Sequence, residues 1–336
     1  MSKKSVQTIA DIARLAKVSK ATVSRALNDS PLVRAETKER ILRIAREHNF
    51  RINAPARQLS MRQSRTVAFV THAHHKDFSV ADLFVLEIMG GIASGLHSSG
   101  YDMLVVQVDP RDTEWAHQYL DTGRVDGFVL MTSSRKQVHI KTLVEMGAPF
   151  IVWGAPPPDA SYCSVTGDNI TGGRLAAEHL LRRGCKRIAF LGGPADEVEV
   201  QHRYKGYRMA LQAAGLKADP ALRFHGDYSS ASAEAGMQRL LDQSPDLDAV
   251  FANSDLMAIA AIEVIQRSGR KVPEDVAVVG YDDLSIAAYN NLPLTTIRQN
   301  IPLAGRLLAQ NLIQYLQTGV VTNVTLPVEL VVRKSA

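Results

Sequence analysis

The sequence predicts two parts: a small all-α helix-turn-helix module at the N-terminus, and a larger α/β body with doubly wound parallel sheets in two lobes. Three observations support this prediction. Charge is uneven, because residues 1–65 hold 15 Lys and Arg against 5 Asp and Glu, whereas the remainder carries a net charge of −5. The first 50 residues show helical periodicity. From residue 66 onward, apolar runs alternate with helical stretches.

Length and composition exclude several classes of protein. A chain of 336 residues with 46% hydrophobic and 22% charged residues is typical of a globular protein of two or three domains. No apolar run reaches the roughly 18 residues of a membrane span, and the polar, basic N-terminus has no secretory signal. Cys163 and Cys185 fit neither a disulfide framework nor a paired-cysteine metal site. We therefore expect a cytoplasmic protein without membrane association.

The basic module contains three helices by its apolar spacing. Thr8 can cap the first helix, and Ser19 can cap a second short helix over residues 20–27. One face of the first helix repeats at helical spacing through Ile9, Ile12, Ala13 and Ala16. A third amphipathic helix runs from about residue 35 to residue 48. Two short helices joined by a three- or four-residue turn have the helix-turn-helix geometry.

The second helix carries side chains that suit a DNA major groove. Its outer side presents Lys20, Ala21, Thr22 and Arg25. Arg and Lys can bond bidentately to guanine, and Ala can contact a thymine methyl group. Ser19 and Ser24, with the helix N-terminus, are suited to phosphate contacts. The alternative is an ordinary three-helix bundle, which the basic charge of this module disfavours.

Three segments carry a resemblance to a known family: residues 9–13, 18–28 and 53–59. They resemble the DNA-binding headpiece of the lactose-repressor (LacI) family of bacterial transcription regulators, and VSKATVSRALN at this distance from the N-terminus matches that family's signature. The resemblance adds Asn28 to the residues expected at DNA. One departure is Arg34, which stands where the family usually has a serine cap and weakens that cap by ~1 kcal/mol.

Residues 51–65 form a short basic linker with one isolated leucine, Leu59. The resemblance implies a pair of hinge helices, one per subunit, that insert this leucine into the minor groove at the operator centre, with Arg57 beside it at the DNA. Such insertion unstacks the bases but bends the duplex toward more protein contacts. The alternative is that Leu59 packs against the body.

The body alternates buried strands with helices throughout. The expected strands are residues 66–70, 103–108, 127–131, 150–153, 187–191, 249–252 and 277–280, with a last apolar strand at 328–332. The expected helices are residues 87–98, 173–183, 204–214, 231–243 and 257–268. This alternation predicts parallel sheets, and its length, about twice one Rossmann-size unit, predicts two lobes.

Further landmarks extend the resemblance over nearly the whole chain, at residues 167–173, 203–207, 253–258, 279–283 and 293–297. The family body is similar to periplasmic sugar-binding proteins, in which two lobes joined by three crossovers enclose a ligand. The resemblance implies a helix-turn-helix domain at 1–50, a hinge at 51–65 and an effector-binding and dimerisation body at 66–336. Lobe one then takes about 66–161 and 293–320, and lobe two about 162–292 and 321–336.

The ligand should bind at the carboxyl ends of the strands. Arg203 and Asp282 match the family's effector-binding Arg and Asp, and such a pair can bind adjacent sugar hydroxyls. Tyr228 falls where the family often places an aromatic ring, which suits a pyranose face. The weaker candidates are Asp255, Ser254, Thr171, His72, Asp82, Phe84 and Thr132. The alternatives are a structural ion pair for Arg203 and a helix cap for Asp282.

Enzymatic and metal chemistry lack support in the sequence. The histidines at 72, 74 and 75 have no partner cluster, and their spacing fits no structural zinc pattern. No phosphate-binding GxxxxGK[ST] motif, GxGxxG motif after a strand, or GxSxG nucleophile motif occurs. We therefore expect no catalytic residue, no cofactor and no metal ion.

The prediction is a homodimeric, sequence-specific DNA-binding regulator, acting as a repressor at the nucleoid under control of a small effector, most simply a sugar. Two-fold symmetry predicts a pseudo-palindromic double-stranded operator. No leucine heptad follows the last strand, so we expect a dimer. Three alternatives stay open: the same regulator sensing a nucleobase or a phosphorylated metabolite, a sugar-binding protein of transport, and an enzyme acting on sugars.

Overall fold

The computed structural model describes residues 8–27, 30–50, 63–72, 83–109, 111–131, 137–157 and 160–336. The chain divides into two compact units at Ser64 and Arg65, and each unit is described by itself. Within the described ranges, no helix combines the length and the apolar character that crossing a bilayer requires.

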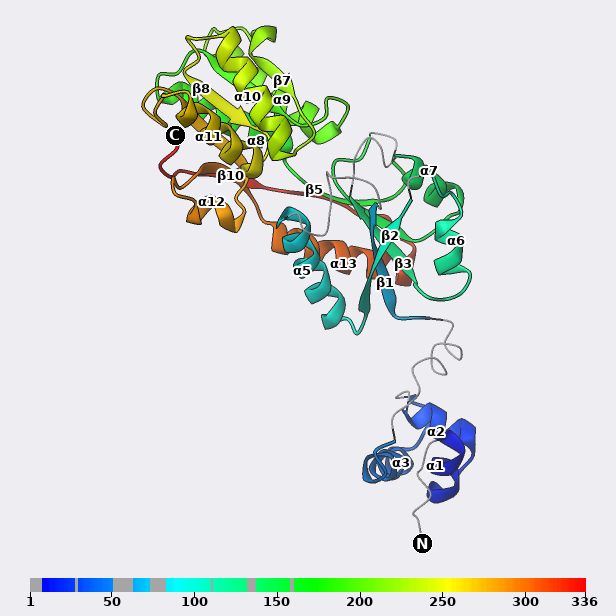
Figure 1. Cartoon of the computed structure of the whole chain (residues 1–336). Helices are drawn as coiled ribbons and strands as arrows, with labels where there is room; N and C mark the ends of the chain where they lie inside the picture. Colours follow the sequence, from blue (N-terminus) through cyan, green and yellow to red (C-terminus); the bar gives the residue numbers. More distant parts are fainter. Residues whose placement is uncertain are drawn as a thin grey trace. The chain divides into compact units, whose positions relative to one another are not determined.

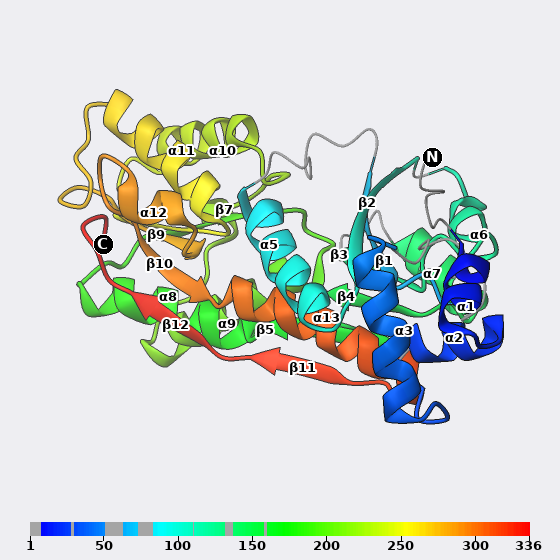
Figure 2. The same cartoon turned by 90° about the horizontal axis from the view of Figure 1, so that it is seen from below.

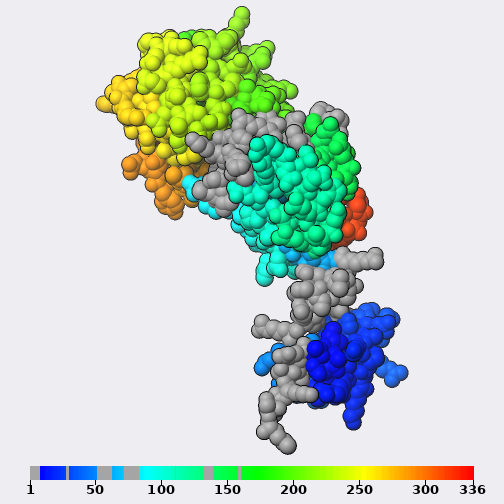
Figure 3. Space-filling model, turned by 45° about the vertical axis from the view of Figure 1, so that its right-hand side comes forward, coloured from blue at the N-terminus to red at the C-terminus, as the bar shows by residue number. Residues whose placement is uncertain are grey.

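The N-terminal unit contains α1 (Ile9–Ala16), α2 (Lys20–Leu27) and α3 (Ala35–Glu47) (Figure 1). The Thr8 hydroxyl accepts from the Asp11 N–H at 3.2 Å, and the Asp11 carboxylate accepts from the Thr8 N–H, which closes a capping box. The three expected helices are confirmed, including Arg34 as an N-cap without a side-chain cap hydrogen bond. Their buried core consists of Ile12, Ala13, Ala16, Val23, Ala26, Ile41 and Ala45. The space-filling view shows this unit in blue (Figure 3).

The first lobe of the body is built on a six-stranded parallel sheet in the order β11-β5-β4-β3-β1-β2. These strands are β1 (Thr66–His72), β2 (Asp102–Val108), β3 (Gly127–Met131), β4 (Phe150–Trp153), β5 (Cys163–Gly167) and β11 (Asn323–Leu326). Helices α5 (Leu83–Ser98) and α13 (Ile301–Thr318) pack on one face. Helices α6 (Trp115–Leu120) and α7 (Gln137–Glu145) cover the other, so the sheet is doubly wound.

The second lobe repeats this architecture with the order β12-β10-β9-β8-β6-β7. These strands are β6 (Ile188–Gly192), β7 (Arg223–His225), β8 (Ala249–Ala252), β9 (Ala277–Asp282), β10 (Thr295–Gln299) and β12 (Val328–Val331). One face packs against α8 (Asn169–Arg182) and α9 (Val198–Ala213), and the other against α10 (Ser230–Gln243) and α11 (Asp255–Arg267). A short helix, α12 (Ser285–Tyr289), follows β9. The edge strand β12 runs antiparallel to β10, and the other pairs are parallel.

The chain passes between the lobes three times: after β5, after β10, and between β11 and β12. Register pairs Gly167 with Leu326 and Gln299 with Val328, so the three crossovers lie side by side. Figure 2 shows β11 and β12 continuing from one lobe into the other.

The expected lobe boundaries are wrong by one strand at each crossover. Residues 163–167 were expected in lobe two but pair with β4 as β5, and residues 323–326 pair with β5 as β11. Residues 295–299 were expected in lobe one but pair with β9 as β10. Each crossover strand pairs within one sheet up to its last residue. The pattern of polar and apolar residues does not mark where the chain then leaves that lobe.

The expected helices of the body also begin too late. Helix α9 starts at Val198 and α8 at Asn169, because each includes a polar first turn that apolar periodicity does not register. The Asp168 carboxylate caps α8 by accepting from the Thr171 N–H at 3.0 Å. Four of the described strands escaped prediction, β5, β7, β10 and β11, and all four are short and carry polar residues.

Candidate functional site

The outer face of α2 presents the residues predicted to contact DNA. Ser19, Lys20, Ala21 and Arg25 are exposed, whereas Thr22 and Ser24 are half-buried. The Ser19 hydroxyl accepts from the Thr22 N–H at 3.1 Å and so caps the helix. Val23 and Ala26 anchor the opposite face at 0% and 1% exposure. The core contacts of these two residues therefore hold α2 in place while its outer face stays exposed. Three further predicted DNA contacts, Asn28, Arg57 and Leu59, lie outside the described residues.

An open cavity lies between the two lobes of the body, with about 660 Å³ of empty space that includes open solvent. Lobe one contributes Phe84, Met131 and Trp153 to its lining. Lobe two contributes Glu197, Glu199, Arg203, Tyr228, Ser254, Leu256, Asp282 and Leu284.

Arg203 is the cationic group of the cavity and is fixed from three sides. It is 6% exposed, although it lines the cavity. Its Nε donates to the Asn169 side-chain oxygen at 2.8 Å, and its terminal nitrogen donates to the Asn253 carbonyl at 2.6 Å. The guanidinium also lies 3.7 Å from the centre of the Tyr281 ring. These contacts hold the planar donor group in a single orientation toward a ligand.

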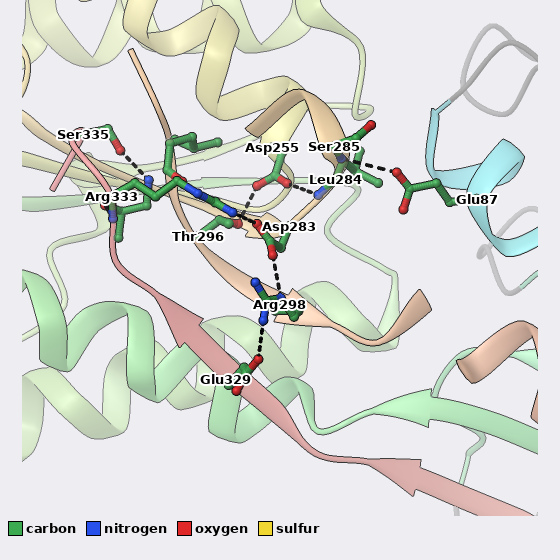
Figure 4. A network of polar contacts seen from close by, with 12 residues as sticks. Glu87, Asp255, Asp283, Leu284, Ser285, Thr296, Arg298, Glu329, Arg333 and Ser335 are labelled. Atoms are coloured by element: carbon green, nitrogen blue, oxygen red, sulfur yellow. Dashed lines mark hydrogen bonds and ion pairs between the residues drawn. The ribbon is translucent and has the colours of Figure 1, made fainter. Parts of the chain in front are cut away.

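Asp282 reaches the cavity from a strained turn. Its φ is 112° and that of Asp283 is 57°, both in the left-handed region that L-residues rarely adopt. The Asp283 carboxylate forms ion pairs with Arg298 and Arg333, each at 2.6 Å, and these pairs hold the turn (Figure 4). Gln299 donates to an Asp282 oxygen at 2.8 Å. The carboxylate is therefore oriented before any ligand arrives.

Tyr228 adds an aromatic ring whose hydroxyl is already engaged. Its φ of 68° is again in the left-handed region. The hydroxyl donates to Glu197 and accepts from the Asn253 amide at 3.4 Å. Burial, followed by the charge of Glu197, raises the pKa of Tyr228 well above its usual value. The ring therefore remains a neutral surface at physiological pH.

The cavity combines acceptors, donors and aromatic faces. Three carboxylates, those of Glu197, Glu199 and Asp282, outnumber the single guanidinium. Trp153 and Phe84 add an aromatic pair with ring centres 6.0 Å apart. Carboxylates and a guanidinium bind hydroxyl groups well, and flat rings pack on apolar sugar faces, so the site suits an uncharged polyhydroxylated ligand. Among the described residues, no cluster of three or more His, Cys, Asp and Glu side chains is arranged for a metal ion.

The structure brings together five of the predicted effector residues. Those that line the cavity are Arg203, Asp282, Tyr228, Ser254 and Phe84. Asp82, Thr132 and the side chain of His72 lie outside the described residues, so their predicted roles stay predictions.

Two predicted effector residues, Asp255 and Thr171, lie outside the cavity lining. Asp255 is fully buried, where one carboxylate oxygen accepts from the Leu284 N–H at 2.7 Å and the other from the Thr296 hydroxyl. Thr171 lies in the first turn of α8, where its N–H meets the Asp168 cap. Neither residue lines the cavity. Placing Asp255 there from sequence was wrong because its carboxylate turns toward the backbone of the next loop.

Six lining residues escaped sequence analysis: Met131, Trp153, Glu197, Glu199, Leu256 and Leu284. A signal existed for two of them, Glu199 and Trp153. Glu199 precedes Arg203 by one helical turn, so the same face of α9 that carries the arginine also carries this carboxylate. Trp153 ends a predicted strand, and the carboxyl ends of strands form such sites.

Comparison with known proteins gives consistent matches over both units. Residues 8–53 match the profile described as "Bacterial regulatory proteins, lacI family", and residues 177–336 match "Periplasmic binding protein-like domain". The transcriptional regulator CelR of Thermobifida fusca is 39% identical, over 98% of each chain.

Two solved structures extend this similarity to the fold. A complex of the transcriptional regulator CelR with cellobiose has a TM-score of 0.76 and 37% identity, covering 98% of this chain and 99% of that one. The lac repressor dimer bound to operator and the anti-inducer ONPF has a TM-score of 0.83 and 30% identity, covering 98% of each chain.

Proposed function

This chain belongs to the LacI family of bacterial regulatory proteins, and from that premise we propose that an uncharged carbohydrate in the interlobe cavity controls its affinity for DNA. The chain is a transcriptional regulator, and its homodimer binds operator DNA. The proposal locates it in the cytoplasm, at the chromosome. It further assigns residues 1–50 to DNA binding, 51–65 to the hinge and 66–336 to effector binding and dimerisation.

In this proposal α2 enters the major groove of each half-site. Lys20 and Arg25 are the groups that read guanine edges, and Ser19 contacts phosphate. The hinge places Leu59 in the minor groove at the operator centre, with Arg57 at the DNA beside it. A two-fold dimer requires a pseudo-palindromic site.

One observation supports a carbohydrate effector over a phosphorylated one. The cavity places three carboxylates and one fixed guanidinium beside an aromatic pair. That set offers both acceptors and donors to hydroxyl groups, while its excess negative charge repels phosphate. Similarity to a regulator solved with cellobiose makes cellobiose the first ligand to test.

The test is calorimetric titration of the dimer with cellobiose, glucose, glucose 6-phosphate and a nucleoside, combined with operator binding in the presence of each. We expect cellobiose to bind and to change operator affinity by about 5- to 150-fold, the usual size of such coupling. A nucleoside or a sugar phosphate binding in its place would overturn the carbohydrate assignment but not the regulator. The operator is first selected from random DNA.

Arg203 provides the matched variant for this test. Arg203→Ala should remove the effector response and leave operator binding intact, because the guanidinium is a cavity donor. Arg239→Ala on the exposed face of α10 removes the same charge from the same lobe and should change neither. An unchanged response in Arg203→Ala would show that the effector binds elsewhere.

A further inference from the structure

Two backbone N–H groups beside the cavity donate to glutamates of the opposite lobe. Ala155, which follows β4 in lobe one, donates to the Glu199 carboxylate of lobe two at 2.8 Å. In the reverse direction, Ser285 of lobe two donates to the Glu87 carboxylate of lobe one at 3.3 Å (Figure 4). Each lobe thus contributes one acceptor and one donor.

The second contact is supported by apolar packing. Leu284 comes from lobe two, yet it is 4% exposed and belongs to the same apolar cluster as Val85 and Ile88 on α5 of lobe one. The buried Asp255 carboxylate accepts from the Leu284 N–H and so fixes the backbone that presents the next N–H, that of Ser285, to Glu87.

The first contact involves the cavity wall directly. Glu199 and Arg203 occupy the same side of α9, one turn apart, and both line the cavity. Ala155 follows Trp153, which lines the cavity from lobe one, by two residues. Any separation of the lobes at this point moves the aromatic wall away from the arginine.

We propose that Glu87 and Glu199 are reciprocal latches, two carboxylates whose interlobe hydrogen bonds hold the lobes closed over the effector cavity. Glu87 is a positioning residue, because it does not line the cavity but favours the closed body in which the cavity walls meet. Both hydrogen bonds must break when the lobes separate. Loss of one latch therefore weakens the other, although the two share no atom.

Hydrogen–deuterium exchange of the full-length dimer, without ligand, tests this coupling. The two reporters are the peptides that contain Ala155 and Ser285. Glu87→Ala should speed exchange at both, by about two- to tenfold, the equilibrium equivalent of one hydrogen bond. Glu199→Ala should likewise speed exchange at the Ser285 peptide. Glu87→Gln keeps a carbonyl acceptor and should restore slow exchange at both peptides.

Glu145→Ala is the matched control, because Glu145 is an exposed glutamate of lobe one that pairs with Lys141 within α7. It should leave both peptides unchanged. If Glu87→Ala speeds exchange only at the Ser285 peptide, the contact is local and the proposal is overturned. Thermal unfolding checks that each variant is folded, and Glu199→Ala, read at the Ser285 peptide, decides the matter if Glu87→Ala is not folded.

A second readout connects the latches to effector binding and rests on the proposed function. With cellobiose as the probe, Glu87→Ala should weaken binding by about two- to tenfold, because more of the body is open. Glu87→Gln and Glu145→Ala should bind as the parent does. If the parent itself does not bind cellobiose, the effector assignment fails while the exchange experiment still decides the latches.

Discussion

At the scale of single residues, the direction in which a buried carboxylate points, rather than its burial, decides whether it serves the fold or faces a ligand. Asp255 and Asp282 are both buried carboxylates near one loop, but only Asp282 lines the cavity. Asp255 gives both oxygens to the Leu284 N–H and the Thr296 hydroxyl, whereas Asp282 accepts from Gln299 and also lines the cavity. The family resemblance ranked Asp282 above Asp255, but both were expected at the effector, because residue type and position along the chain do not show where a carboxylate points.

Replacement of Asp255 tests its structural role. Burial, followed by repulsion from Asp282, raises the pKa of Asp255 well above its usual value. Because the folded state then binds this proton more tightly than the unfolded state, stability falls as pH rises from the usual aspartate range through the raised pKa. Asp255→Asn should remove this part of the pH dependence and equal or exceed the parent in stability at neutral pH.

Asp255→Ala is the contrasting variant. It leaves the Leu284 N–H and the Thr296 hydroxyl without their buried acceptor, and should lower stability by about 2–3 kcal/mol. Denaturant unfolding of both variants, at several pH values between about 4 and 8, measures the difference. If Asp255→Asn loses as much stability as Asp255→Ala, the negative charge itself is required.

Arg25 gives the sharpest residue-level prediction for the DNA-binding unit. It is exposed on α2, and a bidentate contact with guanine contributes about 1–3 kcal/mol of discrimination. Arg25→Ala should therefore abolish specific operator binding at working concentrations and leave effector affinity unchanged. Arg14→Ala on α1, where Arg14 pairs with Asp11, is the control. Gel-shift titration against operator and random DNA measures both, and retained specificity in Arg25→Ala would contradict the recognition-helix assignment.

At the scale of elements, α8 and α9 pack closely enough that their backbones touch. A Cβ on Gly206 would overlap the Ile170 carbonyl and lie 2.7 Å from the Arg174 nitrogen. A Cβ on Gly173 would overlap the backbone of Arg203. Because these neighbours are backbone atoms, they cannot move aside cheaply. This close approach is what places the α9 arginine against the strands that line the cavity.

Gly206→Ala should therefore destabilise the body by about 1–3 kcal/mol and weaken effector binding, since it displaces the helix that carries Arg203. Gly90→Ala is the matched control, because a Cβ there meets nothing within 4 Å in the chain. It should raise stability by up to ~1 kcal/mol through helix propensity. Denaturant unfolding and effector titration compare the pair, and equal effects would show that helix contact is not the cause.

How far sequence predicts these elements depends on periodicity. The three N-terminal helices are predicted almost to the residue, because caps such as Thr8 and Ser19 mark their starts and apolar faces mark their length. Buried parallel strands such as β3 and β4 are equally clear. Strands β5, β7, β10 and β11 are short and carry polar residues, and become strands only through their neighbours in the sheet.

The candidate site is less predictable than the helices and strands, because tertiary contacts rather than local patterns bring its residues together. Arg203, Asp282 and Tyr228 were identified by resemblance, but Glu197 is the N-cap of α9 and required tertiary structure to place it in the cavity. The interlobe hydrogen bonds join residues 44 and 198 positions apart. No local sequence pattern predicts a contact between residues so far apart in the chain.

At the scale of the whole molecule, the DNA-binding unit and the effector-binding body differ in net charge. Residues 1–65 carry a net charge of +10 and the remainder −5, so the two units respond differently to salt. DNA binding releases counterions from phosphate. For a dimer with roughly 6–10 phosphate contacts, operator affinity should fall about 10³–10⁵-fold between about 50 and 200 mM salt. An uncharged effector displaces no counterions, so its affinity in the absence of DNA should change less than about twofold over the same range.

Titration of the same preparation with operator and with cellobiose, at four salt concentrations, measures both slopes. A sugar phosphate provides the internal contrast, because its binding to a cavity with three carboxylates should strengthen as salt screens the repulsion. A steep salt dependence of cellobiose affinity would mean that the effector contacts the basic unit, or that its binding depends on the charge of that unit. In that case the cavity of the acidic body would not be the sole site at which the effector acts.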